Sequence, residues 1–217
     1  MSSTQEQLRD LQEIRNMMER SSKFVSLSGL SGIAAGVCAL IGATIAYLYI
    51  HNNQAAGEVA YYEQIQQTQT WGVGYARFLM LDGLGTAVCA AVFATLFTKQ
   101  KANRQGLKLY NKTSVRLFFQ MAVPLVCGGV FCLSLLYHGQ LAYIAPATLV
   151  FYGLALFNAS KYTFHDVIYL GFANLILGCI GLFWLRHGLI LWVFGFGVSH
   201  IIYGVWMYFK YDRKLSE

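Results

Sequence analysis

The chain has 217 residues, of which 56% are hydrophobic and only 12% are charged. Because a soluble domain has about 25% charged residues, this composition excludes an ordinary soluble fold and predicts an all-α membrane protein whose main partner is the lipid bilayer. The net charge of +6 does not indicate a nucleic-acid partner. Nearly all of the basic residues lie in short loops and tails, where orientation in a bilayer explains them.

The first 23 residues are predicted to form a short amphipathic helix on the cytoplasmic surface of the membrane. Leu8, Leu11 and Ile14 begin an apolar stripe with three-residue spacing, and charged side chains cover much of the remaining segment. A helix with this pattern lies in the plane of the membrane interface. In the alternative interpretation, residues 1–22 dock a cytoplasmic partner or a second protomer of a homo-oligomer.

Six apolar segments follow, and they predict one membrane domain over residues 24–209. Each segment has roughly the 20 residues that are needed to cross about 30 Å of hydrocarbon. A basic cytoplasmic tail, residues 210–217, ends the chain. The predicted spans are residues 24–50, 71–97, 116–137, 143–160, 167–185 and 189–209.

The positions of the basic residues predict the orientation of these spans. Six spans place 14 of the 16 Lys and Arg residues on one side of the membrane, leaving only Arg77 and Arg186 elsewhere. Cytoplasmic loops carry an excess of Lys and Arg. We therefore expect a protein of the plasma membrane or bacterial inner membrane with both termini in the cytoplasm, since five or seven spans would scatter these charges.

A repeat of about 50 residues predicts that the six spans form three helical hairpins. Such a period indicates one supersecondary unit that is used more than once. Each His-Gly pair is expected to make a sharp turn between two antiparallel helices. Both copies enter from the cytoplasmic side, so the repeats are predicted to be parallel, and a looser third copy covers the first two spans. The recurring pairs are His138-Gly139 with His187-Gly188 and Lys161-Tyr162 with Lys210-Tyr211.

Three polar side chains are predicted near the centre of the bilayer, namely Asp82, Asn174 and His200. An ionisable group at that depth costs about 2.5–3.5 kcal/mol on insertion scales, so Asp82 is expected to face protein or water. In the functional hypothesis Asp82 binds a cation or a proton, with Thr86 on the same helical face, while Asn174 and His200 orient the ligand. In the alternative, these polar groups satisfy one another within seams of small residues. One such seam, Gly32-x-x-x-Gly36, would let a second helix backbone approach closely.

A second candidate site lies at the outer ends of the odd-numbered spans, where His51, His138 and His187 are predicted. If these side chains converge, they suit a borderline metal together with Glu58 or Glu63, or they titrate between about pH 5 and 8 as a gate. The alternative is that His-Gly is simply a good turn at an interface. No tight ligand spacing such as H-x-x-x-H supports a metal site, so the sequence leaves the metal and any cofactor open.

The leading functional hypothesis is a channel or transporter for a small solute or an ion, proton-coupled in one version, with Asp82 in its path. The sequence contains none of the common nucleotide-binding, metalloprotease or hydrolase motifs, and it assigns no catalytic residue, so a function other than catalysis is favoured. One alternative is a membrane-embedded metal or haem enzyme that uses His200 and Asp82. Another is a membrane sensor or assembly subunit that signals through the N-terminal helix.

Overall fold

The computed structural model describes Gln7, Arg9 and residues 28–52, 72–104, 106 and 112–213, and it describes only the backbone of residues 51, 52 and 72–76. The described residues contain helices and short turns and no strand. Long apolar runs favour helices because a helix pairs its own backbone polar groups. The elements are α2 (Gly29–Asn52), α4 (Gly72–Arg104), α5 (Lys112–Tyr137), η1 (Leu141–Tyr143), α6 (Ile144–Ala159), α7 (Val167–Phe183), η2 (Leu185–His187), α8 (Gly188–Trp192), η3 (Val193–Val198), α9 (Ser199–Met207) and η4 (Tyr208–Asp212).

Among the residues that the structure describes, five helical stretches are long and apolar enough to cross a membrane, and α7 is a shorter apolar helix of 17 residues. The prediction of an all-helical protein built from membrane-length apolar helices is therefore confirmed. The chain has the architecture of an integral membrane protein. The predicted N-terminal helix over residues 1–23 lies outside the described residues except for Gln7 and Arg9, which are both helical. The five stretches are Gly29–Ile50, Arg77–Arg104, Lys112–Tyr137, Leu141–Ala159 and Leu185–Asp212.

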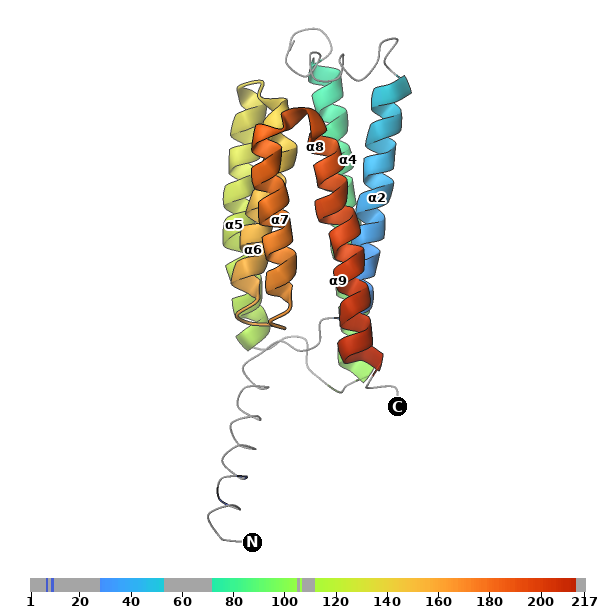
Figure 1. Ribbon diagram of the computed structural model, residues 1–217, viewed down its shortest axis with the longest axis vertical. Coiled ribbons are helices and arrows are strands. Elements are labelled where there is room, and N and C mark those ends of the chain that lie inside the picture. The colour runs from blue at the N-terminus through green and yellow to red at the C-terminus, as the bar shows by residue number, and fades with distance from the viewer. Residues whose placement is uncertain are drawn as a thin grey trace.

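The helices are arranged in two groups that stand side by side (Figure 1). In the first group, α6 packs against both α5 and α7. In the second group, α2 packs against α4 and against the last helix, which we define as the unbroken helical stretch from α8 through η4. The elements η2 and α8 join the two groups at one end of the molecule (Figure 1).

Glycines set the distance between α2 and the last helix. A Cβ atom on Gly32 would lie 3.0 Å from the Cα atom of Gly204, and one on Gly36 would lie 2.7 Å from the carbonyl oxygen of Gly197. Only residues without a side chain allow two backbones to pack this closely. The prediction that the Gly32-x-x-x-Gly36 face admits a second helix backbone is therefore confirmed.

The two His-Gly pairs do not occupy equivalent positions in their turns. Gly139 follows α5 with φ +72°, a left-handed conformation that glycine adopts without steric cost. In the second copy the chain leaves α7 at Trp184, and Gly188 has φ −53° and begins α8. The prediction of the same sharp His-Gly turn in both copies is therefore wrong. The reason is that α7 ends at Phe183, four residues before His187, so the turn is completed before the chain reaches the glycine.

Candidate functional site

A cavity of about 170 Å³ lies between the two helix groups, next to η1, η2 and α8. We call this side of the molecule the cavity end. Four parts of the chain line the cavity: α2, α4, the η1–α6 segment and the η2–α8 segment. Its walls are mainly aliphatic, so it offers an apolar surface to a ligand. Representative wall residues are Ala46, Ile50, Leu79, Ile144 and Leu189.

Asp82 on α4 is the only charged residue among the described residues that line the cavity. The side chain is half-buried. Within the described part of the chain, its carboxylate receives no hydrogen bond and forms no ion pair. The structure therefore places one carboxylate at the wall of an apolar cavity, with no countercharge among the described residues.

Thr86, one helical turn after Asp82, has a packing role in the structure. A Cβ atom on Gly42 of α2 would overlap Thr86 Oγ1, so the two helices meet closely at this point. Thr86 is not among the cavity-lining residues. Gly85, the residue before Thr86, is exposed, and no described atom lies within 4 Å of the position that a Cβ atom would take there.

His200 is buried between the two helix groups, and both of its ring nitrogens have partners. Nδ1 lies 3.0 Å from the carbonyl oxygen of Gly195, and Nε2 lies 2.8 Å from the hydroxyl of Tyr152 on α6. A carbonyl oxygen can only accept a hydrogen bond, so Nδ1 carries the proton and Nε2 accepts from Tyr152. Neither nitrogen is left to bind an iron or another metal in this arrangement. The geometry therefore does not favour the hypothesis of a haem or metal enzyme built on His200 and Asp82.

Asn174 is fully buried on the face of α7 that packs against α6. Its Nδ2 donates a hydrogen bond to the carbonyl oxygen of Leu170 at 2.9 Å. Its Oδ1 has no hydrogen-bond partner among the described residues and lies close to Gly195. Neither Asn174 nor His200 lines the cavity. The structure thus brings Asn174 and His200 together at Gly195 and places Asp82 at a different site.

The outer histidines lie in or next to the turns at the cavity end. His138 and His187 are both exposed, and each ring contacts an aromatic neighbour, Tyr137 and Trp184 respectively. The side chain of His51 lies outside the described residues. Among the residues whose side chains are described, no group of three or more His, Cys, Asp or Glu residues is close enough to hold a metal ion.

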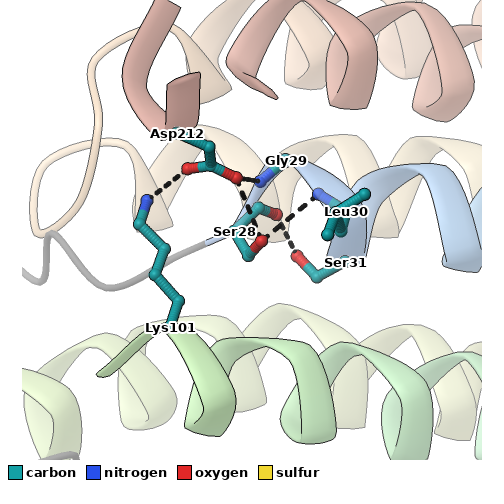
Figure 2. A network of polar contacts seen from close by, with 6 residues as sticks. All are labelled: Ser28, Gly29, Leu30, Ser31, Lys101 and Asp212. Carbon is teal, nitrogen blue, oxygen red and sulfur yellow. Dashed lines mark hydrogen bonds and ion pairs between the residues drawn. The ribbon is translucent and has the colours of Figure 1, made fainter. Parts of the chain in front are cut away.

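An ion pair at the opposite end of the molecule, which we call the Asp212 end, connects three helices (Figure 2). Asp212 Oδ1 in η4 lies 2.7 Å from Lys101 Nζ on α4, and the two side chains are only 11% and 10% exposed. Asp212 Oδ2 accepts hydrogen bonds from Gly29 N at 2.9 Å and from Ser28 Oγ at 3.1 Å. Because the first backbone N–H groups of a helix have no partner within the helix, Asp212 caps the start of α2 from the far end of the chain.

A second ion pair ties the first helix group to this network. Asp166, in the turn before α7, lies 2.6 Å from Lys210 Nζ and accepts a hydrogen bond from the Tyr211 hydroxyl at 3.0 Å. In the same turn, the ring of Phe164 lies 4.3 Å from that of Tyr211 and 5.4 Å from Lys101 Nζ. The two helix groups are therefore held together at the Asp212 end by charge, hydrogen bonds and contacts between aromatic rings.

Sequence reasoning missed these polar contacts because it treated Lys101, Lys210 and Asp212 only as charges of loops and of the tail. One signal was present in the sequence, since Asp212 and Glu217 are the acids of an otherwise basic tail and Asp166 is the only acid of its connection. Tyr152 gave no signal, because it is one of 14 tyrosines in a chain rich in aromatic residues.

Comparison of the chain with models of known protein families, with curated proteins and with solved structures finds no match. The function is therefore inferred from the site alone.

Proposed function

We propose that this protein is a six-span channel or transporter of the plasma membrane or bacterial inner membrane, and that it moves a small solute or an ion that binds at Asp82. Both termini lie in the cytoplasm in this proposal, so the Asp212 end is the cytoplasmic end. The cavity end then faces the other side of the membrane.

The observation that carries the proposal is the cavity between the two helix groups with Asp82 in its wall. Ligand sites in helical proteins are commonly clefts between helices with a few polar groups in an apolar lining. An ionisable residue within a membrane span marks a solute or ion pathway more often than a packing site. The Asp82 carboxylate, without a partner among the described residues, is such a residue.

The distribution of ionic contacts supports a molecule that is open at one end and closed at the other. The cavity lies next to η1 and η2, which contact each other. At the Asp212 end, the pair Asp166–Lys210 connects the two helix groups, and the pair Lys101–Asp212 connects α4 to the last helix within the second group. A solute that enters the cavity would therefore reach Asp82 and stop, unless the contacts at the Asp212 end separate.

The number and pairing of the spans are also part of the proposal. Besides the five long stretches, α7 is an apolar helix of 17 residues, which spans about 26 Å at 1.5 Å per residue. The packing of α2 with α4, and of α5 with α6, supports two of the three proposed hairpins. In the third hairpin, α7 contacts α8 and η3 but packs more extensively against α6.

The test is electrical recording from proteoliposomes on a solid-supported membrane, with concentration jumps of H⁺, Na⁺, K⁺ and small organic cations. We expect the wild-type protein to move charge in response to at least one of these. Asp82→Asn keeps the shape of the side chain and removes the charge, so it should abolish the signal while the thermal unfolding temperature stays close to that of the wild type.

Thr95→Val is the matched control, because Thr95 is an exposed residue of the same helix whose hydroxyl only donates to the carbonyl oxygen of Val92. This variant should leave both the signal and the unfolding temperature unchanged. A stable Asp82→Asn protein that moves as much charge as the wild type would overturn an essential role for this carboxylate.

A further inference from the structure

We infer that the solute bound at Asp82 is an organic monocation, a tertiary or quaternary ammonium with a mainly apolar body. This inference rests on the proposed function, because it names the substrate class of the same site. It follows from the charge, the lining and the size of the cavity.

The sign and the size of the charge follow from the lining. Asp82 contributes one negative charge, and no described lining residue contributes a positive one. Arg77 lies five residues earlier on α4, which places it about 140° around an ideal helix, and it does not line the cavity. A carboxylate away from bulk water is costly unless a cation compensates its charge. A single positive charge on the ligand is therefore the simplest complement.

A metal ion is a poor fit to the same lining. Ca²⁺ takes six to eight oxygen ligands and Mg²⁺ requires a near-octahedral set. The described side chains of the lining offer the Asp82 carboxylate and one hydroxyl, that of Thr148. The Thr148 hydroxyl already donates to the carbonyl oxygen of Ala145 at 2.7 Å. The remaining lining side chains are aliphatic, apart from Met80 and Trp192, so they offer no oxygen to a metal.

The apolar walls and the volume indicate the body of the ligand. A cavity of about 150 Å³ lined by aliphatic and aromatic side chains binds benzene, and this cavity has about 170 Å³. It therefore has room for one ring or for several short alkyl groups. The indole of Trp192 lines the cavity, and its ring centroid lies 4.9 Å from that of Phe196. It provides an aromatic face of the kind that attracts ammonium ions.

The number of hydrogen-bond acceptors decides between classes of ammonium. A primary ammonium has three N–H donors, and each donor left unpaired in a buried site weakens binding. Among the described residues, the lining supplies only the Asp82 carboxylate and the Thr148 oxygen as side-chain acceptors. A tertiary ammonium needs one acceptor and a quaternary ammonium needs none, so both fit this lining better than a primary amine or a guanidinium does.

The test uses the full-length protein in lipid nanodiscs and measures the dissociation constants of two water-soluble probes from tryptophan fluorescence. Benzyltrimethylammonium is the cationic probe, and benzyl alcohol is the neutral probe for the apolar walls. We expect both to bind to the wild type. Asp82→Asn should weaken the binding of benzyltrimethylammonium by roughly thirtyfold, the effect expected when one partner of a desolvated charge pair is removed. The same variant should leave the binding of benzyl alcohol unchanged.

Two further variants complete the design. Asp82→Glu keeps the charge and should retain the preference for the cation, and Trp192→Phe should reduce the fluorescence response and show that the signal comes from the cavity. Equal affinity of the wild type and Asp82→Asn for benzyltrimethylammonium would overturn the inference. So would tight, Asp82-dependent binding of Na⁺ or Ca²⁺ by a protein that does not bind benzyltrimethylammonium. If the protein binds Na⁺ in this way, a signal for Na⁺ in the proteoliposome recordings would still support transport. A protein that gives no signal for any cation would count against the proposed function itself.

Discussion

The hydroxyl of Tyr152 lies 2.8 Å from Nε2 of His200, and this hydrogen bond joins α6 of the first helix group to α9 of the second. The two residues are 48 positions apart in the chain, and the His200 ring is buried. Because the other ring nitrogen is held by the carbonyl oxygen of Gly195, His200 acts here as a neutral bridge between the groups.

We expect Tyr152→Phe to destabilise the protein, because it leaves a buried acceptor, His200 Nε2, without a donor. The cost of an unsatisfied buried polar group is about 1–3 kcal/mol. The free energy of unfolding, measured by denaturant titration in mixed micelles, checks this prediction. Tyr137→Phe is the matched control, since Tyr137 is 86% exposed. Equal stability of Tyr152→Phe and the control would show that the bridge contributes nothing.

The effects of replacing Lys101 and of replacing Asp212 on the free energy of unfolding should depend strongly on each other. Removing one partner of a buried ion pair costs about 3–5 kcal/mol, because the other charge is left uncompensated. Asp212→Ala should lose this amount, and it should also lose the cap of α2. Lys101→Met combined with Asp212→Asn should cost less than the sum of the two single changes, which a double-mutant cycle of unfolding free energies measures.

The pair between Asp166 and Lys210 offers a contrast at the same end of the molecule. The side chain of Lys210 is 44% exposed, compared with 10% for Lys101. Exposed ion pairs contribute only about 0.2–1 kcal/mol. Lys210→Gln should therefore lower the unfolding free energy by much less than Asp212→Ala does. A loss as large as that of Asp212→Ala would contradict the assignment of the stronger contact to the buried pair.

The contact between α2 and the last helix should not tolerate a methyl group. A Cβ atom on Gly204 would lie 2.5 Å from the backbone nitrogen of Ile33, and backbone cannot move aside as a flexible side chain can. We expect Gly204→Ala to cost about 1–3 kcal/mol of unfolding free energy, as overpacking does. Gly85→Ala is the control on α4, because no described atom lies within 4 Å of its Cβ position. A tolerated Gly204→Ala would mean that the helices are further apart.

The proposed orientation predicts that Ala55→Cys and Gln105→Cys are labelled from opposite sides of the membrane. A membrane-impermeant thiol reagent applied to one side at a time measures this. The background protein should have its native cysteines replaced, although all of them lie within the predicted spans. Labelling of both positions from the same side would contradict six spans. The native cysteines are Cys38, Cys89, Cys127, Cys132 and Cys179.

Features that depend on one helix at a time could be predicted from the sequence. The apolar runs predict the helices, and the spacing of Gly32 and Gly36 predicts a face that packs closely on another backbone. Each of these properties follows from local geometry.

Features that depend on which helices become neighbours could not be predicted. Asp82, Asn174 and His200 were placed at similar depths, but depth does not determine the direction in which each helix turns its side chain. In the structure Asp82 lines the cavity, whereas Asn174 and His200 meet at Gly195. Likewise, Asp212 lies 111 positions after Lys101 in the sequence, and only the packing of α2, α4 and η4 brings them together.

The π-helical element η3 changes the helical phase of everything that follows it. A π-turn holds one more residue than an α-turn, so counting by 3.6 residues from Trp192 goes out of step by about 100° beyond Val198. His200 is the second residue after η3, and its ring meets Tyr152 with this extra residue in place. Deleting one residue of η3 would restore a regular helix, and it would turn His200 away from α6.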